Sequence, residues 1–222
     1  MKKGIYTLPN LFTFTNMLCG FLSLSCVVKD KYEYAALLIL LGMIFDFLDG
    51  YVSCRLDKES EFGKRLDSFA DLITFGIAPV ILIFAASFKP QGYIHKFSLL
   101  IYFIAISYRL IRYSLRNNKN IFQGLPATFS GGFIAFIFLS FPIFFTKPWS
   151  FLFFLILAYL SISSIPYKKI VVKKNSATLF TTLILIILSL VFKEYLILSL
   201  FVLYLLSGFM NVFYLRKKSI RK

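Results

Sequence analysis

Four aspartates stand at helical spacing where the sequence is otherwise apolar. Asp46 and Asp49 are three residues apart near the end of one apolar run, and Asp67 and Asp71 are four apart near the start of the next. On a helix, both spacings place the two side chains on one face, and a hairpin of the two helices brings the pairs together. Converging carboxylates at a membrane boundary repel one another and resist desolvation, so they need cations. A set of ligands made only of oxygen atoms predicts Mg²⁺ or Mn²⁺.

The elements that must position these acids are apolar runs. The 222 residues are 59% hydrophobic and 16% charged, which excludes a disordered chain and an ordinary soluble domain, where about a quarter of residues are charged. Helices satisfy their backbone polar groups in lipid, and the runs show no strand-like alternation. We therefore expect an all-α, polytopic membrane bundle with about eight transmembrane helices, at residues 11–28, 34–52, 69–88, 97–113, 127–145, 150–165, 178–192 and 195–215.

The basic residues alternate between the connections of these helices. Most of the 25 Lys and Arg residues fall at the N-terminus, in every second connection or at the C-terminus. The exceptions are Lys29, Lys31, Lys89, Lys96, Lys147 and Lys193. The positive-inside rule then predicts that both termini and the acidic stretch face the cytoplasm. Because topology accounts for the formal charge of +15, we expect the lipid bilayer, and no nucleic acid, as the partner of the basic residues.

The acidic stretch has the spacing D-x2-D-G-x12-G-x3-D-x3-D. It resembles the signature of the CDP-alcohol phosphatidyltransferase family, usually written D-x2-D-G-x2-A-R-x8-G-x3-D-x3-D, and the residues in register are Asp46, Asp49, Gly50, Gly63, Asp67 and Asp71. Other segments resemble one branch, the bacterial CDP-diacylglycerol–serine O-phosphatidyltransferases. These segments are LPNLFTFTNMLCGFLSL (8–24), DSFADLITFGIAP (67–79), YRLIRYS (108–114), GLPAT (124–128) and SSIPY (163–167). We expect a single membrane domain, 1–222, with a catalytic core over about 1–170 and two additional helices over about 175–215.

The resemblance implies a reaction in which a hydroxyl attacks the lipid-side phosphoryl group of CDP-diacylglycerol and CMP leaves. It implies L-serine as the acceptor, and two divalent ions on Asp46, Asp49, Asp67 and Asp71, with Asp71 also the general base. Two ions that clamp the diphosphate stabilise charge on the attacking and leaving oxygens. The resemblance further implies a homodimer in the inner (cytoplasmic) membrane, with its active site facing the cytoplasm.

The same resemblance assigns further residues to CDP-diacylglycerol. Asn10 and Thr13 match an N-x2-T element that lies close to the nucleotide, although helix capping after Pro9 also accounts for them. Gly50 has no side chain, so the nucleotide can approach the helix there, and Ser60 matches a hydroxyl position near the nucleotide.

Two positions depart from the signature. Ser53 stands where the family has Ala, and Cys54 stands where it has Arg. Cys54 removes a cation expected to face the substrate diphosphate. Arg55 follows at once, but one residue along a helix is a rotation of about 100°. We therefore expect Ser53, Cys54 and Arg55 to lie at the nucleotide, with altered activity or nucleotide affinity.

Arginines on the expected fourth helix form one stripe, at spacings of three and four residues. Arg116 is typical of an anchor at the inner membrane surface. Arg109 and Arg112 lie deeper in the apolar run, and buried cations there call for an anionic partner. The resemblance indicates an acceptor pocket, with Arg112 the stronger candidate to hold the serine carboxylate or a substrate phosphate.

Two alternatives stay open. Another acceptor, such as glycerol 3-phosphate or inositol phosphate, carries an extra phosphate and calls for more cations around Arg109 and Arg112. A divalent-cation transporter would also use the four acids, but it predicts acids near mid-membrane and inverted repeats. In this sequence the acids cluster at one face and no repeat is visible.

Three local features carry expectations of their own. His95 is predicted to lie in a short, solvated loop. Pro79, inside an apolar run, predicts a kink. The polar stretch Asp57–Gly63 predicts a cytoplasmic turn between the second and third helices.

Overall fold

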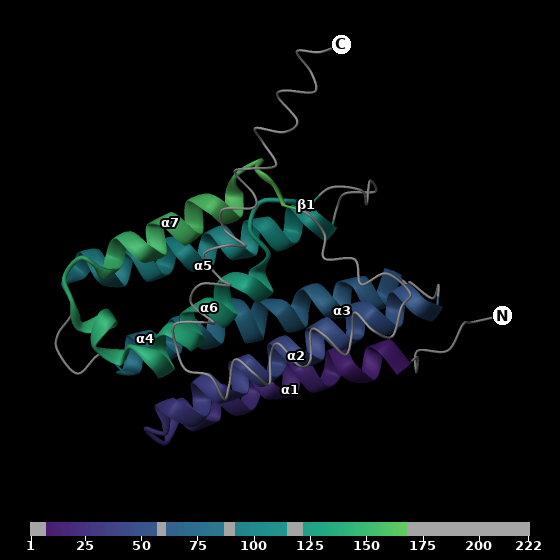
Figure 1. The fold of residues 1–222 in the computed structure, drawn as a ribbon, viewed down its shortest axis with the longest axis horizontal. Coiled ribbons are helices and arrows are strands. Elements are labelled where there is room, and N and C mark those ends of the chain that lie inside the picture. Colours follow the sequence, from purple (N-terminus) through teal and green to yellow (C-terminus); the bar gives the residue numbers. More distant parts are fainter. Residues whose placement is uncertain (1–7, 57–60, 87–91, 115–121, 168–222) are drawn as a thin grey trace, which may run out of the picture. The chain divides into compact units, whose positions relative to one another are not determined.

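The computed structural model describes residues 8–56, 61–86, 92–114 and 122–167 (Figure 1). Its helices are α1 (Leu8–Val28), α2 (Tyr32–Leu56), α3 (Glu61–Asp71), a π-helical turn (Leu72–Ile77), α4 (Ala78–Ala86), α5 (Tyr93–Ser114), α6 (Ala127–Ser140), a 3₁₀ helix (Pro142–Thr146) and α7 (Ser150–Ile162). The predicted all-helical architecture is confirmed over these residues. The one addition is a pair of two-residue strands, β1 (Phe122–Gln123) and β2 (Pro166–Tyr167), which was not predicted.

The chain divides into two compact units. The first comprises Met1–Asn117 and Pro126–Ile162 and contains all the helices named above. The second comprises Asn118–Leu125 and Ser163–Lys222. Within the second unit, β1 and β2 pair antiparallel, and the N–H of Gly124 donates to the carbonyl of Ile165 at 2.9 Å. The φ angle of Gly124 is 83°, a conformation that a glycine adopts without a steric penalty.

Among the described residues, four helices are long and apolar enough to cross a membrane, which indicates a multi-pass membrane protein. They cover Pro9–Val28, Tyr32–Ser53, Glu61–Ala86 and Tyr93–Ser114. Large apolar side chains on their surfaces, such as Leu11, Phe21 and Ile111, are more than 60% exposed, as expected where lipid takes the place of water.

The predicted fifth and sixth spans are shorter in the structure than in the sequence analysis. Helix α6 has 14 residues and α7 has 13, against the roughly 20 that a bilayer requires. Helix α6 stops at Ser140 because Pro142, which has no N–H to donate, begins the 3₁₀ helix. The predicted seventh and eighth spans, 178–192 and 195–215, lie outside the described residues.

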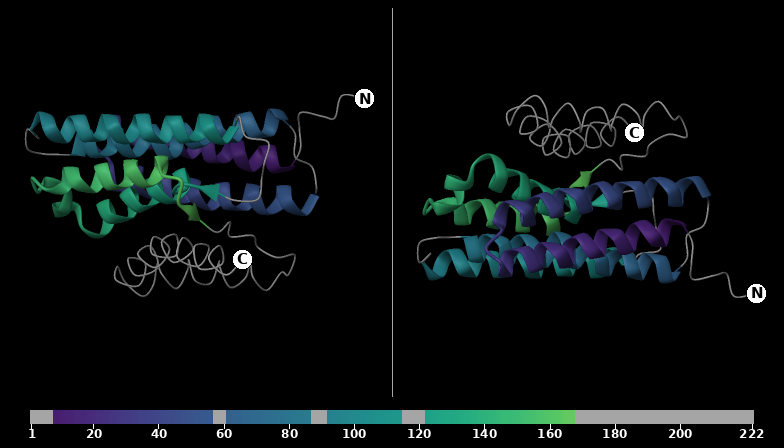
Figure 2. Two further views of the ribbon diagram at one scale, coloured as in Figure 1. Left: turned by 90° about the horizontal axis from the view of Figure 1, so that it is seen from above. Right: turned by 90° about the horizontal axis from the view of Figure 1, so that it is seen from below.

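Helices α1 and α2 form an antiparallel hairpin and lie side by side along their lengths (Figures 1 and 2). Asp30 in the turn adopts a left-handed conformation, with φ of 56°, which aspartate tolerates better than most residues. Ser23 on α1 donates to the carbonyl of Ala35 on α2 at 2.9 Å, and Ala35 and Ala36 are fully buried. Small residues therefore bring the two backbones close together.

Glycines on three helices surround the π-helical turn that follows Asp71. A Cβ added to Gly20 on α1 would lie 2.9 Å from Cα of Thr74, and one added to Gly131 on α6 would lie 2.7 Å from Cα of Phe75. A Cβ on Gly42 of α2 would lie 2.6 Å from Cγ2 of Thr74. The turn thus packs directly against neighbouring helices, which fixes where the preceding residues of α3 lie.

A π-helical turn, Leu72–Ile77, comes just before Pro79, where the sequence predicted a kink. Pro79 has no N–H, so the carbonyl of Phe75, four residues before it, lacks its α-helical donor. The hydroxyl of Tyr102 on α5 donates to this carbonyl at 3.0 Å and also lies 3.2 Å from Oγ of Ser130 on α6. The buried Tyr102 therefore satisfies the backbone group that the proline leaves open.

Two local predictions are corrected. His95 is not in a solvated loop: α5 begins at Tyr93, and His95 is 6% exposed with Nδ1 at 3.2 Å from Oγ of Ser150. The prediction was wrong because the helix begins in polar residues ahead of the apolar run. The turn predicted at 57–63 is also too long, since α3 begins at Glu61; residues 57–60 lie outside the described part of the chain.

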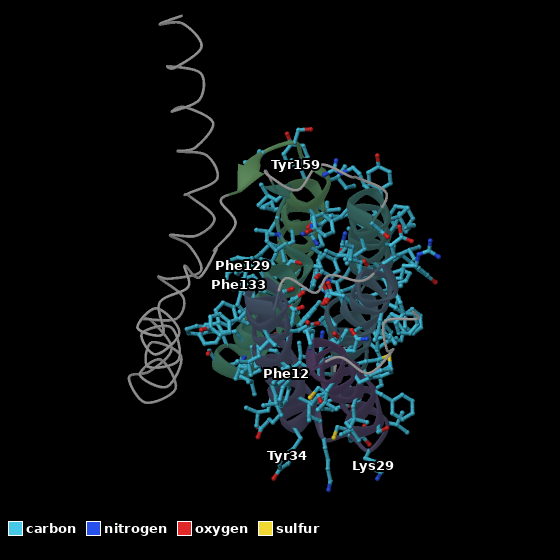
Figure 3. The ribbon with its side chains drawn as sticks, turned by 90° about the vertical axis from the view of Figure 1, so that its right-hand side faces the viewer. Phe12, Lys29, Tyr34, Phe129, Phe133 and Tyr159 are labelled. Carbon is cyan, nitrogen blue, oxygen red and sulfur yellow. The ribbon has the colours of Figure 1, made fainter. Side chains whose placement is uncertain are left out.

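An end-on view shows how the outer surfaces of the helical unit are placed (Figure 3). Lys29 and Tyr34, at the turn between α1 and α2, lie on the side opposite Tyr159 of α7. Phe129 and Phe133, one helical turn apart on α6, lie next to each other, with ring centroids 6.2 Å apart.

Candidate metal-binding active site

The acids converge because helices α1 and α3 begin, and helices α2 and α5 end, at the same end of the helical unit (Figure 1). Asp46 on α2 and Asp67 and Asp71 on α3 each offer a carboxylate oxygen, and these three oxygens lie within 4.8 Å of one another. Asp71 is buried, with 8% of its surface exposed. The hairpin predicted from the sequence therefore does bring acids of both pairs together.

Asp49 is held differently from the other three acids. It does not belong to the group of three acids that the described residues form. It is 7% exposed, and Oδ2 accepts a hydrogen bond from the hydroxyl of Thr13 on α1. The fourth predicted metal ligand thus lies one helical turn along α2 from Asp46, paired with α1.

Two carboxylates of the cluster are also anchored by neighbouring helices. The hydroxyl of Thr128, in the first turn of α6, donates to Oδ2 of Asp46 at 2.8 Å. The side-chain amide of Asn16 on α1 lies 3.4 Å from Oδ1 of Asp71. The acids are therefore oriented by contacts with the helices around them rather than left to rotate freely.

A buried arginine supplies positive charge at the same place. Arg109 on α5 is 5% exposed, and its guanidinium group interacts electrostatically with Asp46, Asp67 and Asp71. One guanidinium can offset the charge of only one carboxylate, so a cation is needed for all three acids to be ionised together. Three carboxylates from two helices, with oxygen-only chemistry, fit Mg²⁺ or Mn²⁺.

Arg112 lies one turn beyond Arg109 on α5, but its side chain contacts the end of α7. Nη1 donates to the carbonyl of Ile162 at the end of α7, at 2.9 Å, and the guanidinium carbon lies 5.8 Å from the ring centroid of Tyr108. Of the two arginines predicted for an acceptor pocket, the structure places Arg109 beside the carboxylates and Arg112 at the end of α7.

The residues predicted for the nucleotide are described in part. Asn10 and Thr13 are 5% and 1% exposed in the first turns of α1. Because α1 begins at Leu8, neither residue caps that helix. Ser53 lies half-buried on α2. Cys54 and Arg55 lie in the last turn of α2, and their side chains fall outside the described part of the structure. Ser60 lies wholly outside the described residues.

Gly50, which the resemblance assigns to the nucleotide, has open space around its Cα. A Cβ added there would meet nothing within 4 Å. Glycine within a helix costs about 1 kcal/mol relative to alanine, and no neighbouring protein atom requires it at this position. Gly50 is exposed and follows Asp49 directly on α2, and its role toward a nucleotide stays a prediction.

Sequence reasoning missed two polar residues at this site, Asn16 and Thr128. Asn16 follows Asn10 and Thr13 at the same three-residue spacing, so the three side chains share one face of a predominantly apolar helix. That polar face was the available signal, because polar groups inside a membrane helix usually have a function. Thr128 gave no such signal, since its partner Asp46 is 82 residues away.

These observations define a multi-pass helical membrane protein with a cluster of carboxylates and an arginine at one end of its bundle. The family model described as CDP-alcohol phosphatidyltransferase matches residues 6–205. The chain belongs to this family, as predicted.

Several similar proteins carry the name of the branch that the sequence resembles. The chain is 34% identical to the CDP-diacylglycerol–serine O-phosphatidyltransferase of Bacillus subtilis over 125 residues, 56% of this chain and 71% of the relative. It is 30% identical to the enzyme of the same name from Helicobacter pylori over 226 residues, 97% of this chain and 95% of the relative. It is also 41% identical to the archaetidylserine synthase of Methanothermobacter thermautotrophicus, over about a third of each chain, 36% and 35%.

Proposed function

We propose that this chain transfers the phosphatidyl group of CDP-diacylglycerol to L-serine and releases CMP. The observation that carries the proposal is the group of carboxylate oxygens of Asp46, Asp67 and Asp71, within 4.8 Å of one another and next to Arg109. Membership of the family and the names of its relatives support the chemistry and the acceptor. A lipid substrate suits the architecture, because acyl tails can stay in the bilayer while the head group reaches the acids.

We propose that two divalent ions, Mg²⁺ or Mn²⁺, bind at Asp46, Asp49, Asp67 and Asp71. Bound there, they would stabilise negative charge on the diphosphate as the reaction proceeds. The three clustered acids come from two helices joined at one end, and the contact of Asp49 with Thr13 keeps the fourth acid close to α1.

In the proposed reaction, Asp71 acts as the general base. Its carboxylate takes the proton of the serine hydroxyl, and the serine oxygen forms a bond to the lipid-side phosphorus. The bond between that phosphorus and the bridging oxygen breaks, and CMP leaves with the electron pair. The buried position of Asp71 among the helices limits access of water to the reacting oxygen.

The remaining residues bind and orient the substrates. Open space beside Gly50 would take the nucleotide. The other residues assigned to CDP-diacylglycerol are Asn10, Thr13, Ser53, Cys54, Arg55 and Ser60. Arg109 and Arg112 would serve the acceptor, since a guanidinium can bind the serine carboxylate with two hydrogen bonds.

We further propose eight membrane spans, with both termini and the active site on the cytoplasmic side of the inner membrane, and a homodimeric assembly. The alternation of basic residues along the sequence supports the orientation. Accessibility of single introduced cysteines to a membrane-impermeant reagent, in cells and in inverted vesicles, tests it. Cross-linking in the membrane tests the dimer.

The acceptor is tested by CMP release from CDP-diacylglycerol with purified protein. L-serine, glycerol 3-phosphate and inositol phosphate are supplied in turn, and the lipid product is identified by mass. The proposal predicts release with L-serine and a phosphatidylserine product. Release only with a phosphorylated acceptor would reassign the enzyme within its family. Metal flux into sealed vesicles without CMP release would favour the transporter alternative, which family membership disfavours.

A further inference from the structure

Asn16 is the buried polar side chain at the site that no assignment above uses. It lies on α1, is 0% exposed, and its amide nitrogen is 3.4 Å from Oδ1 of Asp71. That separation is at the long end for an N–H···O hydrogen bond. The net contribution of this hydrogen bond to folding is therefore small.

The surroundings of Asn16 fix which end of its amide faces Asp71. Oδ1 is buried without a hydrogen-bond partner and lies 2.9 Å from where a Cβ on Gly42 would be. The amide oxygen therefore rests against the glycine backbone, where a Cα–H group can approach it. The reverse orientation would place two N–H groups against that backbone and turn the amide oxygen toward a carboxylate.

The backbone of Asn16 is tied to the same region as its side chain. The hydroxyl of Thr74, in the π-helical turn after Asp71, donates to the carbonyl of Asn16 at 3.0 Å. Thr74 also occupies the space left by Gly20 and Gly42. Asn16 thus contacts the residue that it would orient and the turn that follows it, so its position relative to Asp71 is set from two directions.

We propose that Asn16 is a positioning residue for Asp71: its side-chain amide, lodged against Gly42, donates to Oδ1 and fixes the plane of the carboxyl group. A carboxylate held in one orientation keeps its remaining lone pairs directed at the site, where they can bind a cation and accept the proton of the acceptor hydroxyl. This inference deepens the proposed function, because it rests on Asp71 acting at the reaction centre. Partners of this kind typically change metal affinity or activity by about 10–100-fold when removed.

The test replaces Asn16 in the full-length protein and measures two quantities. Asn16→Ala removes the amide, and Asn16→Leu keeps the number of side-chain heavy atoms without a donor. The first readout is the Kd for Mn²⁺, from the signal of free Mn²⁺ in electron paramagnetic resonance. The second is serine-dependent CMP release, separated into kcat and KM for CDP-diacylglycerol. Thr15→Val, at the preceding position of α1, is the matched control, because within the described residues the Thr15 hydroxyl donates to the carbonyl of Leu11 and not to an acid.

We expect both Asn16 variants to weaken Mn²⁺ binding about tenfold and to lower kcat by about 10–100-fold. The KM for CDP-diacylglycerol and the behaviour of Thr15→Val should stay close to those of the wild type. In an Asp71→Asn background, which itself weakens Mn²⁺ binding at least as much, Asn16→Ala should change the Kd no further. A residue with a purely structural role would change the Kd equally in both backgrounds.

The inference is overturned if Asn16→Leu binds Mn²⁺ and turns over like the wild type, or if its effect on the Kd persists in full without Asp71. If Asn16→Ala is not produced as a folded membrane protein, the measurements on Asn16→Leu alone decide for or against the inference. Failure of the proposed function looks different: the wild-type protein would release no CMP with any acceptor, while the Mn²⁺ titrations of the Asn16 variants would still report on Asp71.

Discussion

The hydroxyl of Thr128, at the start of α6, donates a hydrogen bond of 2.8 Å to Oδ2 of Asp46, in the C-terminal half of α2. This contact joins the acidic stretch of the sequence to a residue 82 positions further on. Asp46 is at the same time one of the three clustered acids, with Asp67 and Asp71. The first prediction concerns the loss of this hydrogen bond.

Thr128→Val keeps the shape of the side chain and removes its donor. We expect CMP release to fall about 10–100-fold and Mn²⁺ binding to weaken, because the Asp46 carboxylate loses the contact that orients it. Thr128→Ser, which keeps the hydroxyl, should retain most of the activity. Thr146→Val is the control, since within the described residues the Thr146 hydroxyl donates to the carbonyl of Ile143 in its own 3₁₀ helix. Equal activity of the Val and Ser variants would remove Thr128 from the site.

Asp71→Asn removes the proposed base and leaves the other carboxylates in place. We expect a folded protein that still binds Mn²⁺, more weakly than the wild type, and releases no CMP above background. Asp30→Asn, in the exposed turn between α1 and α2, should leave turnover unchanged. Turnover of Asp71→Asn close to that of the wild type would defeat its assignment as the general base.

Gly50 and Gly131 should respond to alanine in opposite ways. A Cβ at Gly131 would lie 2.7 Å from Cα of Phe75, so Gly131→Ala forces α6 away from the π-helical turn. We expect a lower thermal midpoint in detergent, from a cost of about 1–3 kcal/mol. Gly50→Ala meets no neighbour and improves helix propensity by about 1 kcal/mol, so its midpoint should not fall. Its KM for CDP-diacylglycerol should rise if the open space takes the nucleotide, and an unchanged KM would contradict that role.

Arg112→Gln tests whether the second arginine of α5 serves the acceptor. If its guanidinium binds the serine carboxylate, the KM for L-serine should rise about tenfold or more while kcat changes little. This is the pattern expected when a contact is lost that binds the substrate and the transition state equally well. If Arg112 serves only the carbonyl of Ile162, to which it donates at 2.9 Å, the KM for serine will stay constant and the thermal midpoint will fall. The two kinetic constants and the midpoint are measured on the same preparation.

The sequence predicted the helical architecture and the clustering of acids because both depend on local periodicity. Apolar runs give the helices of a membrane protein, and spacings of three and four residues give one face. The role of Asn16 was accessible by the same logic, since it continues the face of Asn10 and Thr13. Its partner was not, because a single sequence does not show which helix that face meets.

Other features depend on tertiary packing and could not be predicted. The position of Arg109 beside the acids, with Arg112 turned to the end of α7, follows from how α5 is rotated in the bundle. His95 is buried because Ser150 and Phe154 of α7 cover it, although a lone histidine beside a polar connection is typical of a surface. The π-helical turn needed Pro79, but also the glycines of α1, α2 and α6 that let it pack.

The central claim is that the carboxylates of α2 and α3 bind divalent metal in order to drive transfer to serine. The most direct measurement is serine-dependent CMP release by the purified protein in a chelator, followed by titration with Mn²⁺ or Mg²⁺. The account predicts no release in the chelator, recovery on titration, and no recovery at any metal concentration when Asp46, Asp67 and Asp71 are all replaced by Asn. Undiminished release in the chelator, or full recovery of the triple variant, would contradict it.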